Sequence, residues 1–223
     1  MSASTLESGA YEYRLNGALT PIRERWLRLR REGGGWLITS SRNAPGVELA
    51  VEATADAGRV TDFEVNWRGE GQPGITACYS LLPDRVSVMR SRGGQVTERR
   101  EIEIAPGLQA PLLSPLMRIF AGPLIARLLE NGGAGAVIVP DIRDPQAPET
   151  LLLPLLSERQ AELMDADSAL LVEGVSVPCR RCAYHGDQYR PGTQFWLGAN
   201  DVLLRYEWRQ AQQHWDVRLR GTG

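Results

Sequence analysis

Alternation of apolar and polar residues runs through the first hundred residues and constrains the fold more than any other feature. In the segment YEYRL, Tyr11 and Tyr13 fall on one face and Glu12 and Arg14 on the other. The same pattern continues in VELAVEA, DFEVNW, ITACYSL, RVSVM and VTERREIEI. A period of two is that of a half-buried β-strand. Because only short turns rich in Gly, Pro, Asn and Asp separate these segments, the sequence predicts an antiparallel meander.

The middle of the chain has a helical pattern instead. Residues 114–131 place leucine, isoleucine and phenylalanine at helical spacing, with Ser114 as N-cap and Pro115 at the first helical position. The pair Gly122-Pro123 predicts a kink or a split in this helix. A second, shorter helix is predicted at Pro154–Met164.

The last third returns to strands, and FWLGANDVLLRYEW is its clearest hairpin. Strands, then helices, then strands again indicate one continuous sheet with helices packed across it. We therefore expect a single β-rich domain spanning residues 1–223, with a helical insertion near 113–165. Its fold class is mainly β (α+β).

Composition excludes several classes of protein. The formal charge of −2 and the pI near 5.8 give no electrostatic footprint for nucleic acid, and the basic stretch from Arg23 to Arg31 reads as a solvated strand face. The longest apolar stretch, 112–129, is too interrupted to span a bilayer. Three cysteines fit a reducing compartment. We expect a cytoplasmic protein, or a periplasmic one if a leader has been trimmed before Met1.

Three segments carry a resemblance to a known family: GAYEYRLNG…RERW, SPLMRIFAGP and FWLGANDVLLRYEW. Together they resemble the bacterial half-barrel domains typified by the lipoprotein carriers LolA and LolB, and uncharacterised proteins of that lipocalin-like architecture. The resemblance implies a strongly curved antiparallel sheet, or half-barrel, closed by one kinked and one short helix. It also implies that the concave face holds an acyl chain or another hydrophobic ligand. We find no export signal or lipobox of a lipoprotein carrier, and the family offers no catalytic residue to carry over.

The segment VPCRRCAYHG is the one place that looks like a metal or redox site. Metal-binding Cys-x-x-Cys pairs sit on tight knuckles, but Cys179 and Cys182 fall within a predicted strand and would point to opposite faces. A zinc site would need Cys78, His185 and His214 to gather around them. A redox pair would need a βαβ context that the sequence lacks. We predict no metal and no cofactor, with Cys182 and Tyr184 on one face of an ordinary strand.

Two functions from different classes follow. The first is binding of a hydrophobic small molecule, such as a lipid, acyl chain or aromatic compound, in the concave face. The candidate ligand-binding residues are Trp67, Met117, Phe120, Leu124, Tyr206 and Trp208. The second is a lyase or isomerase that uses His185, Tyr184 and Asp187 as an acid-base set in the same cavity.

A third possibility is a structural or protein-binding module that uses an exposed sheet edge. The oligomeric state is left open by the sequence.

Overall fold

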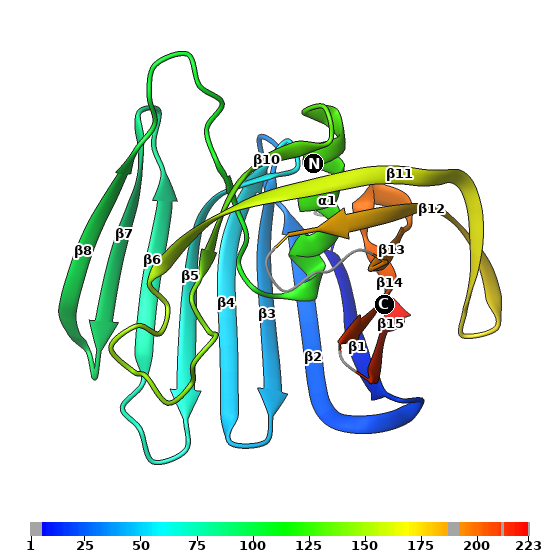
Figure 1. Ribbon diagram of the computed structural model, residues 1–223, viewed down its shortest axis with the longest axis horizontal. Coiled ribbons are helices and arrows are strands. Elements are labelled where there is room, and N and C mark those ends of the chain that lie inside the picture. Colours follow the sequence, from blue (N-terminus) through cyan, green and yellow to red (C-terminus); the bar gives the residue numbers. More distant parts are fainter. Residues whose placement is uncertain (1–5, 187–191, 211, 223) are drawn as a thin grey trace.

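The computed structural model describes residues 6–186, 192–210 and 212–222. Its framework is one sheet of 15 strands that curves strongly without closing (Figure 1). The predicted fold class, a mainly β protein with a curved antiparallel sheet, is confirmed. The strands are β1 Leu6–Leu15, β2 Ala18–Arg30, β3 Trp36–Ala44, β4 Val47–Asp56, β5 Arg59–Gly69, β6 Ile75–Leu81, β7 Arg85–Arg92, β8 Gln95–Glu103, β9 Leu112–Leu113, β10 Ala134–Pro140, β11 Pro154–Val172, β12 Val175–His185, β13 Gln194–Leu197, β14 Leu203–Gln210 and β15 Gln213–Thr222.

The sheet is a meander with one long-range joint. Its strand order runs from β8 down to β1, then to β15, and from there down to β9. Neighbouring strands are therefore consecutive in the chain, except where β1 pairs with β15 in antiparallel register, Tyr13 opposite Val217. One neighbouring pair, β9 and β10, is parallel, and the helical segment connects these two strands. The hairpin predicted at FWLGANDVLLRYEW is present as β13 and β14, joined by a 3-10 turn, η2, at Ala199–Asp201.

The predicted helix at residues 114–131 is shorter and straighter than expected. It begins with a 3-10 turn, η1, at Arg118–Phe120 and continues as α1 at Ala121–Glu130. The kink predicted at Gly122-Pro123 is wrong, because Pro123 falls in the first turn of α1, where its missing N–H would have no intrahelical acceptor. Ser114 is not the N-cap, since the chain is still extended at Met117.

Gly122 explains how closely this helix approaches the sheet. A Cβ atom at this position would lie 1.8 Å from the backbone oxygen of Asp201, in η2. Only a glycine therefore lets α1 rest on the turn between β13 and β14. This contact fixes the helix across the concave side of the sheet.

The second predicted helix, at Pro154–Met164, is wrong. This segment is the first half of β11, which pairs with β10 from Pro154 to Gln160 and with β12 from Gln160 onward. Backbone pairing, first with β10 and then with β12, overrides the helical propensity of its Leu, Glu, Gln and Ala residues. β11 passes over the concave side, and its hairpin with β12 projects at one end of the molecule (Figure 1).

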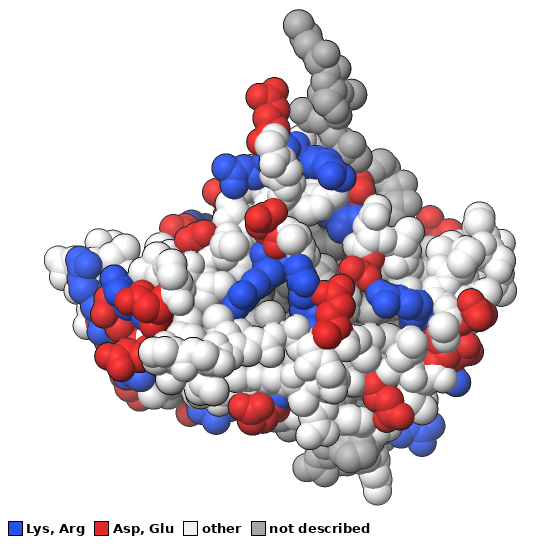
Figure 2. Space-filling view, turned by 90° about the horizontal axis from the view of Figure 1, so that it is seen from above, with Lys and Arg blue, Asp and Glu red and all other residues white. Residues whose placement is uncertain are grey.

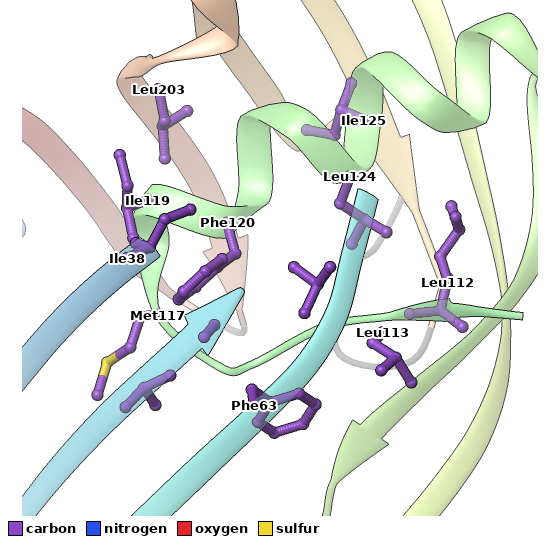
Figure 3. Close-up of a cluster of buried hydrophobic side chains, with 14 of the residues drawn as sticks. Ile38, Phe63, Leu112, Leu113, Met117, Ile119, Phe120, Leu124, Ile125 and Leu203 are labelled. Atoms are coloured by element: carbon purple, nitrogen blue, oxygen red, sulfur yellow. The ribbon is translucent and has the colours of Figure 1, made fainter. Parts of the chain in front are cut away.

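The core lies between the concave face of the sheet and the segment from β9 to α1. Figure 3 shows Phe120 and Leu124 pointing from the helical segment toward strands that carry Ile38 and Phe63. Phe120 is 3% exposed and Phe63 is 4% exposed. The strand alternation read from the sequence thus matches the buried face of β4, β5 and β6.

A loop at 141–153 packs against β6 and β7 near one free edge of the sheet. The Tyr79 hydroxyl donates to the Leu152 carbonyl at 2.7 Å, and the buried Arg90 guanidinium donates to the Leu151 carbonyl at 2.7 Å and to the Pro148 carbonyl. These bonds satisfy loop carbonyls that would otherwise be buried without partners. The loop therefore covers part of the gap that the open sheet leaves.

Candidate functional site

Charged residues occupy inward positions on β2 and β3. Glu24, which is fully buried, alternates in phase with Trp26 and Arg28, and Arg42 lies directly opposite Glu24 on β3. The prediction that Arg23 to Arg31 forms a solvated face is therefore wrong for Glu24 and Arg28. The sequence contained this information, because Glu24 and Arg28 each lie two residues from Trp26 and so fall on the same face of the strand.

Glu24 is held by a defined set of donors. The Tyr13 hydroxyl donates to its Oε2 at 2.5 Å, and the backbone N–H of Arg118 donates to its Oε1 at 2.6 Å. Burial and the nearby charge of Glu24 raise the pKa of Tyr13 to about 12. Tyr13 therefore stays protonated at neutral pH and stabilises the buried carboxylate as a donor. This network ties the start of η1 to the sheet.

The charge of Arg28 is already balanced by other side chains of the protein. Its guanidinium lies 4.7 Å from the centre of the Trp36 ring and donates to Glu7 Oε2 at 2.6 Å. A cation over an aromatic ring, paired with a carboxylate, is a satisfied buried charge. Arg28 therefore needs no ligand.

The candidate binding site is a pocket of about 160 Å³ beside the helical segment. It lies where the start of α1 faces the ends of β10 to β13. Its lining is formed by Arg42, Ser114, Leu116, Met117, Arg118, Ala121, Leu124, Val139, Pro140, Ile142, Arg143, Leu155, Arg159, Tyr184 and Phe195. Most of these side chains are apolar, and the polar ones are mainly arginines. This combination suits a ligand with an apolar body.

Backbone geometry at the pocket is unusual at Leu116. Its φ of 67° lies in the left-handed region, which costs a residue with a Cβ about 1–2 kcal/mol. Such a conformation persists only where the surrounding structure imposes it. Here, pairing of β9 with β10 on one side and the Glu24 contact to Arg118 on the other fix the segment that carries Leu116.

Four arginines converge on this pocket from different elements. Arg42 comes from β3, Arg118 from η1, Arg143 from the 141–153 loop and Arg159 from β11. Arg143 makes a two-pronged contact with Asp141, and Arg118 lies 4.8 Å from the centre of the Tyr206 ring. Figure 2 shows that basic side chains gather near the middle of one face, with acidic side chains beside them. The four arginines lie far apart in the chain, so no single segment of the sequence predicts the cluster.

A row of aromatic rings runs from the pocket across the sheet. Tyr184 and Phe195 meet edge to face at 5.3 Å, and Phe195 stacks on Tyr206 at 5.1 Å. Tyr206 stacks on Trp208 at 4.9 Å, and Trp208 stacks on Trp215 at 5.4 Å. Tyr184 and Phe195 form the wall of the pocket at one end of this row.

The predicted ligand-binding residues are distributed between pocket and core. Met117 and Leu124 line the pocket. Phe120, Trp67 and Tyr206 are buried core residues that do not border it. Trp208 is half-buried and borders a separate hollow of about 320 Å³ together with Glu207 and His214. Of the six residues, the structure therefore brings two to this pocket.

The acid-base candidates are only partly placed. Tyr184 lines the pocket, whereas His185 does not, and Asp187 lies outside the described residues. The Nδ1 atom of His185 is buried and has no hydrogen-bond partner within the described part of the chain. His214 lies next to Trp215 on β15, away from this pocket, with its Nε2 atom 3.6 Å from Glu207 Oε2.

The cysteines lie in ordinary strand positions. Cys179 and Cys182 are both buried in β12, and Cys78 is half-buried in β6. Burial raises the pKa of all three thiols, which disfavours the thiolate that metal binding or redox exchange requires. Among the residues that the structure describes, no group of three or more His, Cys, Asp or Glu side chains is placed to hold a metal ion.

A larger hollow, of about 540 Å³, lies over strands β2 to β5. Exposed and half-exposed polar side chains such as Arg25, Thr39, Glu52 and Glu64 dominate its lining. It lacks the apolar lining of the pocket beside α1, so we do not assign it the ligand. Within the described ranges, none of the helices is both long and apolar enough to cross a membrane.

The curved, open sheet places this protein in the class of β-barrel-like folds. Its sequence matches no protein-family model and no curated protein. Among solved structures, it is similar to a β-barrel-like protein of the domain of unknown function DUF1849 from Brucella abortus. The TM-score is 0.55 at 12% identity, over 98% of this chain and 97% of that chain. The similarity supports the β-barrel-like part of the resemblance drawn from the sequence, while the likeness to lipoprotein carriers stays a hypothesis.

Proposed function

We propose that this protein binds a small hydrophobic molecule in the pocket beside α1, as a carrier or sensor. The observation that supports the proposal is the pocket itself: a cavity with a mainly apolar lining and four arginines, placed between a helix and the concave face of a barrel-like sheet. Binding sites of barrel-like folds commonly lie in such a position.

The size of the pocket limits the ligand. An apolar cavity of roughly 150 Å³ is large enough to bind benzene, and this pocket measures about 160 Å³. It therefore suits one aromatic ring or a short aliphatic chain. A long acyl chain would have to extend beyond it.

The chemistry of the lining favours binding over proton transfer. Its ionisable side chains, among the residues described, are Tyr184 and the four arginines. Arginine stays protonated in proteins, so it orients a ligand but does not exchange protons with it. A lyase or isomerase would require a titrating group such as His185 to reach the cavity, and His185 does not border it.

Filling the pocket tests the proposal. Ala121 lines the cavity, and Ala121→Leu adds bulk where the ligand would lie. We expect the unaltered protein to bind a single-ring or short-chain probe in calorimetry, and the variant to lose most of that affinity while its thermal melt stays cooperative. The matched control is Ala169→Leu, at an exposed position on β11. Equal binding by both variants, or no binding by the unaltered protein to any such probe, contradicts the proposal.

A further inference from the structure

We infer that the ligand carries a carboxylate, so that the pocket takes a small organic acid: one aromatic ring or a short aliphatic chain with a single carboxylate directed at Arg42. The inference rests on the proposed function, because it assigns the head group of a ligand whose body the apolar lining binds.

Arg42 is the residue that points to this chemistry. Its side chain is 12% exposed, and its nearest carboxylate oxygen, Glu24 Oε2, lies at 3.8 Å. That distance is too long for a hydrogen bond, and within the described part of the chain the Arg42 guanidinium makes none. A guanidinium that is mostly withdrawn from water needs both a counter-charge and acceptors for its five N–H groups. Arg42 has a partial counter-charge in Glu24, but its N–H groups lack acceptors among the described residues.

Glu24 does not fill this need, because its nearest oxygen lies too far from Arg42 to accept a hydrogen bond and both oxygens accept from other donors. The Tyr13 hydroxyl occupies Oε2, and the Arg118 backbone N–H occupies Oε1. Both partners hold Glu24 toward β1 and η1, while Arg42 borders the cavity. The Arg42 donors are therefore available to a group inside the pocket.

The surroundings select a negative group. Arg118, Arg143 and Arg159 line the same pocket as Arg42. A planar guanidinium matches a planar carboxylate through two parallel hydrogen bonds. One guanidinium that lacks hydrogen bonds matches one singly charged group, which favours a carboxylate over a doubly charged phosphate.

Paired probes separate the head group from the body of the ligand. Benzoate and benzyl alcohol share a ring, and hexanoate and hexanol share a chain, so each pair differs mainly in the charged group. In calorimetry at neutral pH and low salt, we expect each acid to bind at least about 10-fold more tightly than its alcohol, as expected for hydrogen bonds to a charged group. If acid and alcohol bind equally, the carboxylate inference is wrong while the proposed function stands. If none of the four binds, the proposed function itself fails.

Variants of Arg42 test whether this residue binds the carboxylate of the ligand. We expect Arg42→Gln to lower the affinity for benzoate at least about 10-fold and to leave benzyl alcohol binding within about two-fold. We expect Arg42→Lys, which keeps the charge and loses the planar fork, to restore part of the preference. Arg25→Gln, at an exposed position on β2, is the matched control and should change nothing.

Three outcomes would overturn the inference. The first is an Arg42→Gln variant that keeps the full preference for the acid. The second is a variant that loses the acid and the alcohol alike, which would make Arg42 a structural residue. The third is tighter binding of phenyl phosphate than of benzoate, which would reassign the head group. If Arg42→Gln does not fold, the Arg42→Lys variant and the acid-to-alcohol ratio of the unaltered protein decide the matter.

Discussion

The inward face of β4 to β6 and the inward face of β1 to β3 belong to one sheet but are built from different side chains. On β4 to β6 the buried positions are apolar, apart from the Tyr79 hydroxyl, which is bonded to Leu152. On β1 to β3 the buried positions include Glu24, Arg28 and Ser40. We call these the apolar wall and the charged wall.

The difference between the walls shows what each contributes. A dry apolar surface gains free energy from burial alone. Buried charges gain little net stability and are tolerated only when every group is paired. We therefore expect the apolar wall to contribute more of the folding free energy, while the charged wall also places specific groups beside the pocket.

The largest effect is expected when a charge is moved into the apolar wall. Val65 on β5 is fully buried, and Val65→Glu would place a carboxylate where the structure offers it no partner. We expect a loss of about 5 kcal/mol or more in the free energy of unfolding, measured by urea denaturation. The control, Leu27→Glu on β2 at 40% exposure, should cost less than about 1 kcal/mol. Similar losses in both would show that the two positions do not differ in burial as described.

The helix should depend on the apolar wall. Phe120→Ala removes a ring that is 3% exposed and packs toward that wall (Figure 3). We expect a loss of about 3–5 kcal/mol in thermal or urea unfolding, with little change in the affinity for benzoate below the melt, because the ring does not border the pocket. Leu108→Ala, at 70% exposure, should be nearly neutral. A stable variant with lost binding would instead make Phe120 part of the cavity.

Neutralising the charged wall should have an intermediate effect. Glu24→Gln keeps the shape of the side chain but removes its negative charge. That charge faces Arg42, and the carboxylate accepts a hydrogen bond from the Tyr13 hydroxyl. We expect a loss of about 2–4 kcal/mol, and the pKa of Tyr13 should fall from its raised value, which ultraviolet titration of tyrosine can follow. Glu52→Gln, on the exposed face of β4, is the matched control. A Glu24→Gln variant as stable as its control would mean that the buried carboxylate is not needed by its partners.

The smallest effect concerns Asp216 on β15, which accepts hydrogen bonds from Arg205 and Arg218. Burial alone would raise the pKa of Asp216, but the hydrogen bonds and charges of Arg218 and Arg205 outweigh it and lower the pKa below its ordinary value. A lowered pKa gives stability that is present above the ordinary value near 4 and is lost as the pH falls through the lowered one.

We therefore expect Asp216→Asn to cost about 1 kcal/mol at neutral pH and to make stability less sensitive to acid below about pH 4. Urea denaturation at a series of pH values measures both. Parallel stability profiles for the variant and the unaltered protein would contradict the assignment. Because the apolar wall has no such group, Val51→Ala on β4 should lower the whole profile without changing its slope.

The comparison between the walls also explains how much the sequence could predict. Alternation located β1 and β4 to β7 because one face of each meets the core. It failed at β11, where Leu156, Leu163 and Met164 are exposed and the alternation is weak. There, local helical propensity was the stronger signal, and pairing with β10 and β12 decided the outcome.

The pocket could not be predicted from the sequence for a different reason. Met117 and Leu124 lie seven residues apart on one segment, so a pattern could find them. Arg42, Arg118, Arg143 and Arg159 come from four elements that meet only in the folded chain. Only Arg42 leaves a local trace, because it has the same parity as the inward-facing Ile38 and Ser40.

The pairing of β1 with β15 has a consequence for how the sheet is assembled. Two series of successive antiparallel strand pairs extend outward from this pair, one to β8 and the other to β10. Their joint aligns Tyr13 with Val217 and so closes a loop of nearly the whole chain. Closure entropy rises with loop length, and contacts so distant in sequence slow folding. A circular permutant that links the two ends and opens the connection between β8 and β9 at Gly107 would turn this joint into a hairpin. Because β8 and β9 are not neighbours in the sheet, no other strand pair would become long-range, and we expect faster folding.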